Sequence, residues 1–120
     1  MKKKLIAGNW KMNGTLAANA SLLRSILDGL RSEANCLVAV CVPAPYLAQV
    51  HAVLGGTVVQ MAAQDVSAHA SGAYTGEVSA QMLREFAVRY CLVATQSAAN
   101  TTVKPMLWWH SRRNMHWLLA

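Results

Sequence analysis

The chain has 120 residues, of which 54% are hydrophobic and 13% charged, and its formal net charge is +6. This length suits one domain, and the apolar fraction is too high for an intrinsically disordered chain. No run of about 18 apolar residues is present, so no membrane span is predicted. The basic residues 2–4 precede an apolar stretch too short for a secretory signal, which favours a cytoplasmic protein.

The charge is unevenly distributed along the chain. Residues 1–85 contain all of the acidic residues and carry a net charge of +2, whereas residues 86–120 contain none and carry +4. Three of the four tryptophans also lie in the last 13 residues. We therefore predict two parts of different character, residues 1–93 and residues 94–120.

Apolar segments alternate with segments of helical spacing in the first part. The expected strands cover residues 5–10, 36–42, 57–63 and 89–93. The expected helices cover residues 16–30, with Thr15 as N-cap, 46–54 and 77–86, with Glu77 in the first turn. A long polar loop covers residues 64–76. This alternation is typical of right-handed βα units in a parallel sheet, and beyond residue 93 the pattern favours an irregular or helical tail.

Asn9 and Lys11 follow the first expected strand at its carboxyl end, where parallel βα folds bind ligands. Because strand side chains alternate, residues two apart share one side and can point into one site. A lysine there can hold an anionic substrate, with the asparagine as a hydrogen-bond partner. A solvated lysine and a turn asparagine explain the same spacing.

The segment AGNWKMN at residues 7–13 resembles the end of the first strand of triosephosphate isomerase. The resemblance continues in order through PAPYL at 43–47, AQDVS at 63–67, GAYTGEVS at 72–79, AQML at 80–83 and YCLV at 90–93. It implies a fold made of roughly the first half of a (β/α)8 barrel. It also implies the glycolytic interconversion of dihydroxyacetone phosphate and glyceraldehyde 3-phosphate, with no cofactor and no metal.

The resemblance also implies roles for five residues. Lys11 would contact the phosphate and the developing negative charge of the substrate, and Asn9 would help to shape the site. Thr75, in the third loop, would insert into a neighbouring subunit near its Asn9 and Lys11. Gln64 would lie near this interface, and Glu77 would support the site from behind. A homodimer is therefore expected, although the loop is also compatible with an ordinary surface excursion.

The resemblance ends at Val93. In the family the fourth strand runs into the motif GHSERR, whose histidine polarises the substrate carbonyl. In this chain residues 94–99 are ATQSAA, so the motif is not present at that place. With suitable synonymous codons, one base inserted after codon 93 restores VGHSERRQYHGETDAVV, so we hypothesise a single-base deletion. The family's glutamate base and later phosphate-binding loops would lie beyond residue 120, which implies a truncated chain without activity.

Two other functions stay open. Open edges on the first and fourth strands favour a self-associating half barrel that binds phosphate compounds without catalysis, unless the tail covers one edge. Residues 108–113 (WWHSRR) interleave aromatic and basic side chains, as in modules that bind single-stranded nucleic acid. A hydrophobic tail produced by a shifted reading frame is the favoured explanation of that segment, so a nucleic-acid partner is not expected.

The cysteines and isolated histidines give no further site. Cys36, Cys41 and Cys91 form neither a CxxC pair nor a ligand set with histidine, so buried free thiols are expected. His51 and His69 stand alone in an expected helix and the expected loop, and we predict no function for them.

Overall fold

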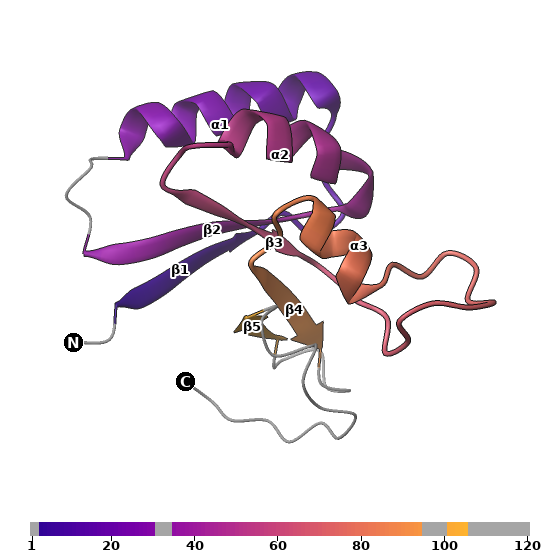
Figure 1. Cartoon of the computed structure of the whole chain (residues 1–120). Coiled ribbons are helices and arrows are strands. Elements are labelled where there is room, and N and C mark those ends of the chain that lie inside the picture. Colours follow the sequence, from indigo (N-terminus) through magenta and orange to yellow (C-terminus); the bar gives the residue numbers. More distant parts are fainter. Residues whose placement is uncertain (1–2, 31–34, 95–100, 106–120) are drawn as a thin grey trace.

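The computed structural model describes residues 3–30, 35–94 and 101–105, and it forms a curled half barrel (Figure 1). Parallel strands alternate with helices in the order β1 (Lys4–Asn9), α1 (Leu16–Gly29), β2 (Cys36–Val42), α2 (Leu47–Leu54), β3 (Val59–Ala63), α3 (Ala80–Glu85) and β4 (Tyr90–Ala94). A 3-10 turn (Ala44–Tyr46) precedes α2, and β5 (Thr101–Pro105) runs antiparallel to β4. The strands follow one another in space as they do in sequence. The predicted parallel βα architecture is confirmed.

The helices cover one face of the sheet, and the side chains of both faces form the core. The larger cluster draws on both strands and helices and includes Val42, Leu47 and Leu83. A smaller cluster contains Cys41, Ala62 and Leu92, and Cys41 is the neighbour of Val42 along β2. Since neighbouring strand residues point to opposite faces, the two clusters occupy the two sides of the sheet. Burial on both faces explains why β2 is apolar throughout, as predicted.

Helix α1 begins where the sequence predicts. The Thr15 hydroxyl accepts a hydrogen bond from the Ala18 N–H at 3.1 Å, which satisfies one free donor of the first turn. Leu23 is fully buried against the sheet. The buried Asn19 side chain donates to Gln49 Oε1 on α2 at 3.1 Å, so a polar contact joins the two helices.

The start of α3 differs from the prediction. The helix begins at Ala80 because the Ser79 hydroxyl caps it, accepting a hydrogen bond from the Met82 N–H at 3.2 Å. Glu77 therefore precedes the helix, and its predicted place in the first turn is wrong. β1 lies one residue earlier than the predicted strand 5–10, and β3 begins at Val59, so the predicted strand 57–63 starts two residues too early.

The tail is also different from the prediction where the structure describes it. Residues Thr101–Pro105 form β5, which pairs with β4 from Tyr90 to Ala94. Three of its five residues are β-branched, which favours extended backbone over the predicted irregular or helical form. The tail thus covers one edge of the half barrel, the alternative left open above. The aromatic and basic segment at residues 108–113 lies outside the described residues.

Within the described ranges, no helix is long and apolar enough to cross a membrane.

Candidate functional site

Hydrogen bonds connect the first-loop residues to the end of β3. The Asn9 side-chain oxygen accepts from the Lys11 backbone N–H at 2.9 Å. The Gln64 side-chain amide donates to the Lys11 carbonyl at 2.9 Å and to the Cys41 carbonyl at 3.0 Å. Three of the residues predicted from the sequence, Asn9, Lys11 and Gln64, are therefore brought together at the carboxyl ends of β1, β2 and β3. The role of Gln64 in holding Lys11 was not anticipated.

Lys11 adopts a left-handed backbone conformation with φ of 54°. Residues with a Cβ atom rarely adopt this region, and such strain is concentrated at functional sites. Because β1 ends at Asn9, strand alternation does not reach Lys11, and the predicted reason for the proximity of the two residues is wrong. A side chain to backbone hydrogen bond joins them instead.

The rest of the first loop is fixed by contacts within the chain. The Trp10 N–H donates to the Cys41 carbonyl at 3.1 Å, which extends the β1–β2 pairing by one residue. The Asn13 side chain donates to the Trp10 carbonyl at 2.8 Å. Lys11 itself is exposed, so its ammonium group is accessible to an anion in solution.

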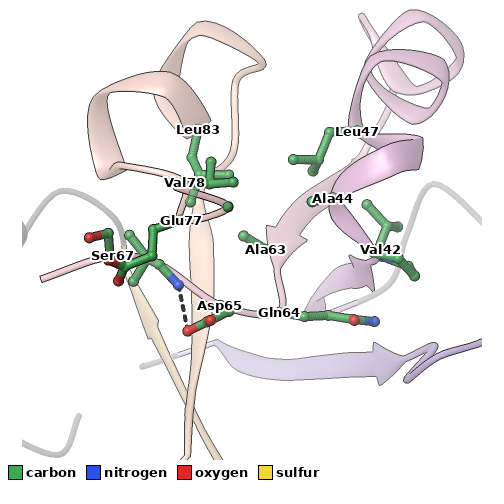
Figure 2. Close-up of a pocket in the computed structure, with 13 residues that line it drawn as sticks. Val42, Ala44, Leu47, Ala63, Gln64, Asp65, Ser67, Glu77, Val78 and Leu83 are labelled. Atoms are coloured by element: carbon green, nitrogen blue, oxygen red, sulfur yellow. Dashed lines mark hydrogen bonds between the residues drawn. The ribbon is translucent and has the colours of Figure 1, made fainter. Parts of the chain in front are cut away.

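A pocket of about 240 Å³ opens beside this loop, between β2, β3, α2 and the third loop (Figure 2). Apolar side chains from Val42, Leu47 and Leu83 contribute to its lining. Its polar lining includes Gln64, Ser67, Asp65 and Glu77, and the Asp65 carboxylate accepts from the Val66 N–H at 2.8 Å (Figure 2). Gln64 is thus shared between the pocket and the Lys11 contacts, whereas Glu77 lines only the pocket.

The third loop, residues 64–79, extends away from the body of the half barrel (Figure 1). Its base is closed by the Ser67 N–H, which donates to the Val78 carbonyl at 2.8 Å. A turn from Tyr74 to Glu77 is closed by a 3.1 Å hydrogen bond, and Gly76 supplies the required positive φ of 87°. Thr75 lies exposed in this turn.

An aromatic contact also shapes this loop. His69 stacks on Tyr74 with ring centroids 3.8 Å apart and planes 2° apart. The sequence predicted no role for this histidine, and its spacing from Tyr74 carries no signal for stacking. Local contacts therefore give the loop its shape.

The Cys91 thiol is unsuited to nucleophilic chemistry. All three thiols are free; Cys41 and Cys91 are buried as predicted, whereas Cys36 is half-buried. Burial, and secondarily the charges of Asp65 and Cys41, raises the pKa of the Cys91 thiol to about 12. Since the thiolate is the reactive species, this thiol is inert at neutral pH. Among the described residues, no group of three or more His, Cys, Asp or Glu side chains is placed to hold a metal ion.

The parallel βα units define the class of this protein as part of a (β/α) barrel. Its candidate site follows the carboxyl ends of the strands, the face at which such barrels bind ligands. Comparison with known families gives a more specific result. The family model described as triosephosphate isomerase matches residues 4–95, and the chain belongs to this family. The resemblance identified from the motifs is confirmed, and the matched segment ends within two residues of the boundary predicted at Val93.

Curated relatives give the same result. The chain is 66% identical over 93 residues to the triosephosphate isomerase of Delftia acidovorans, with 78% of this chain and 38% of the relative covered. It is 65% identical over 94 residues to that of Paracidovorax citrulli, with 77% and 38% covered. For Albidiferax ferrireducens the identity is 57% over 93 residues, with 78% and 37% covered. The chain thus spans less than two fifths of the length of these relatives.

Proposed function

We propose that this chain is a triosephosphate isomerase half barrel that binds triose phosphate through Lys11 and does not catalyse isomerisation on its own. The observation that supports binding is the strained, exposed Lys11, which Asn9 and Gln64 hold at the carboxyl end of β1. An ammonium group presented from a backbone held in this place suits the phosphate dianion and the charge of an enediolate.

The proposed loss of activity rests on the groups that the reaction needs. Isomerisation requires a base that moves a proton between neighbouring carbons and an electrophile that polarises the carbonyl. Residues 94–99 are ATQSAA, so the family's histidine and supporting glutamate are not found after β4. Asp65 and Glu77 line the neighbouring pocket, but Lys11 is not part of that lining. Binding without a positioned base and electrophile leaves little rate enhancement.

We also propose a cytoplasmic homodimer, in which Thr75 of one subunit approaches Asn9 and Lys11 of the other. The exposure of Thr75 and the local contacts that shape its loop support this arrangement. Gln64 and Glu77 flank the same region and would lie at or near the contact.

For residues 94–120 we propose a shifted reading frame. The composition changes near residue 93, and the family match ends at residue 95. Sequencing the encoding DNA tests this proposal. A coding sequence in which no single inserted base near codon 93 restores GHSERR would rule it out.

The proposed function is tested by two measurements on the purified chain. Calorimetry with glycerol 3-phosphate, an unreactive triose phosphate analogue, is expected to show binding that Lys11→Ala weakens about tenfold or more, as loss of a charge-assisted contact should. Lys3→Ala, which removes an exposed lysine outside the loop, is the control and should leave binding unchanged.

A coupled isomerase assay on the same preparations should give no turnover above background. Turnover that disappears in Lys11→Ala would contradict the proposed inactivity. Absence of glycerol 3-phosphate binding to the unaltered chain, or equal weakening by the two lysine variants, would contradict the proposed binding role.

A further inference from the structure

The first loop, residues 10–15, is attached at its far end to the segment that leads into α2. The Tyr46 hydroxyl donates a hydrogen bond to the Gly14 carbonyl at 2.8 Å, across 32 residues of sequence. The bond from Gln64 to the Lys11 carbonyl holds the near end of the same loop. The stretch from Lys11 to Gly14 is therefore held on both sides.

Tyr46 is a rigid support for this contact. It ends the 3-10 turn Ala44–Tyr46, in which its backbone N–H donates to the Pro43 carbonyl at 3.0 Å. Its half-buried ring packs against the larger core cluster, and the next residue, Leu47, is buried and begins α2. Because its ring and its backbone are both held, Tyr46 presents its hydroxyl to the loop from a fixed position.

Gly14 lies directly against this support. Its φ is 134°, a conformation that residues with a Cβ atom rarely adopt. A Cβ atom there would lie 3.0 Å from the Tyr46 ring and 2.6 Å from the side-chain oxygen of Asn19, which is 2% exposed. The packed side chains block movement of Gly14 in one direction, and the hydrogen bond to the Tyr46 hydroxyl opposes movement in the other.

A separate contact from α2 holds the start of α1. The Gln49 side-chain amide donates to the Leu16 carbonyl at 2.6 Å, and its oxygen accepts from Asn19 at 3.1 Å. These bonds do not involve the Tyr46 hydroxyl. Removal of that hydroxyl should therefore loosen the first loop while α1 and α2 stay joined.

We propose that Tyr46 is a positioning residue for ligand binding, whose hydroxyl holds Gly14 and thereby keeps Lys11 in the conformation that binds a phosphate group. This inference rests on the proposed binding role of Lys11. Only Met12 and Asn13 separate Gly14 from Lys11, so a displacement of Gly14 is passed along the backbone. A loop held at one end alone spends less time in the binding conformation, and the apparent affinity falls with that fraction.

Tyr46→Phe in the full chain tests this role, because it removes the hydroxyl and keeps the ring. NMR backbone order parameters at Lys11 and Met12 should fall from about 0.85, typical of rigid backbone, toward about 0.6, whereas those of α2 should stay unchanged. Binding of glycerol 3-phosphate, measured by calorimetry, should weaken about threefold to tenfold, as expected for the loss of one hydrogen bond.

Tyr90→Phe is the matched control. Tyr90 is a half-buried tyrosine that begins β4, at the end of the strands opposite the candidate site, and its variant should leave both measurements unchanged. Equal weakening of binding by the two variants would overturn the proposal. Weaker binding in Tyr46→Phe without a fall in the order parameter of Lys11 would also overturn it, because the hydroxyl would then act by another route. A purely structural role predicts lower stability in urea with both measurements unchanged, and that result would equally overturn it.

The order parameters separate this inference from the proposed function, since they are measured without ligand. If the unaltered chain does not bind glycerol 3-phosphate, the proposed function is contradicted, and the order parameter of Lys11 in Tyr46→Phe still decides whether Tyr46 holds the loop. If the unaltered chain binds and Tyr46→Phe binds equally well with a loosened loop, the proposed function stands and the positioning role of Tyr46 is overturned.

Discussion

At the scale of single residues, Gln64 explains how the candidate site is held. Its amide donates to the carbonyls of Lys11 and Cys41, and these bonds oppose the relaxation of Lys11 from its left-handed conformation. In the proposed function the charge of Lys11 acts together with this restraint, because the hydrogen bonds hold the backbone from which the ammonium group is presented. The side chain of Gln64, the residue that follows β3, supplies that restraint.

We therefore predict that Gln64→Ala weakens glycerol 3-phosphate binding about fivefold to tenfold, although it removes no charge. Loss of the two hydrogen bonds should also lower the free energy of unfolding by about 1–2 kcal/mol. Gln64→Glu should have a larger effect, because a carboxylate would face two carbonyl oxygens. Calorimetry and urea denaturation measure these quantities.

Gln60→Ala is the matched control, since Gln60 is a half-buried glutamine of β3, the strand that Gln64 directly follows. It should leave ligand binding unchanged. Equal loss of binding in Gln60→Ala and Gln64→Ala would show that shortening a glutamine in or directly after β3 acts through the strand and not through Lys11.

The sequence predicted the positions of the site residues better than their conformation. Asn9 and Lys11 are adjacent to the end of an apolar strand, a local pattern that sequence periodicity detects. The Lys11 carbonyl accepts a hydrogen bond from Gln64, which is 53 residues away in sequence, and no local preference of lysine indicates the left-handed φ of Lys11. Long-range hydrogen bonds of this kind are absent from any pattern of neighbouring residues.

At the scale of secondary structure elements, capping side chains decide where helices begin. Thr15 was identified as the cap of α1 because its turn and apolar spacing are clear. For α3 the acidic Glu77 suggested an earlier start, but the Ser79 hydroxyl makes the capping bond. The bounds of β2 were predicted correctly because burial on both faces gives an uninterrupted apolar run.

The capping role of Ser79 leads to a stability prediction. Ser79→Ala should lower the free energy of unfolding by about 1 kcal/mol, because the Met82 N–H loses its acceptor in the first turn of α3. Urea denaturation checks this value. Ser71→Ala, at an exposed serine of the third loop, should change it by less than about 0.5 kcal/mol. A loss in Ser79→Ala as small as that of the control would contradict the role of the cap.

At the scale of the whole molecule, the half barrel is completed on one side by a strand from outside the family match. The match ends at residue 95, whereas β5 comprises Thr101–Pro105. A sheet edge can pair with any strand that supplies backbone donors and acceptors in register. The strand that covers β4 therefore does not have to belong to the family's own sequence. The sequence pattern missed β5 because its residues, TTVKP, lack the apolar run that indicated β3 and β4, which have the same length.

The protection of β4 therefore depends on the backbone of β5. In an antiparallel pair, neighbouring residues direct their N–H groups to opposite sides of the strand. One of the two successive residues Thr102 and Val103 therefore directs its N–H toward β4. The double variant Thr102→Pro/Val103→Pro removes that donor and disfavours the pairing. The double variant Thr102→Ala/Val103→Ala keeps both N–H groups and serves as its control.

We predict that the proline pair opens the β4 edge while β1, β2 and β3 stay paired. Amide hydrogen exchange at Tyr90–Ala94 should become at least tenfold faster, with little change in β2, because only β4 loses its outer neighbour. Light scattering should also show larger species, since the freed edge can pair with other chains. If the proline pair leaves β4 exchange as slow as in the alanine control, the tail does not stabilise the half barrel through strand pairing.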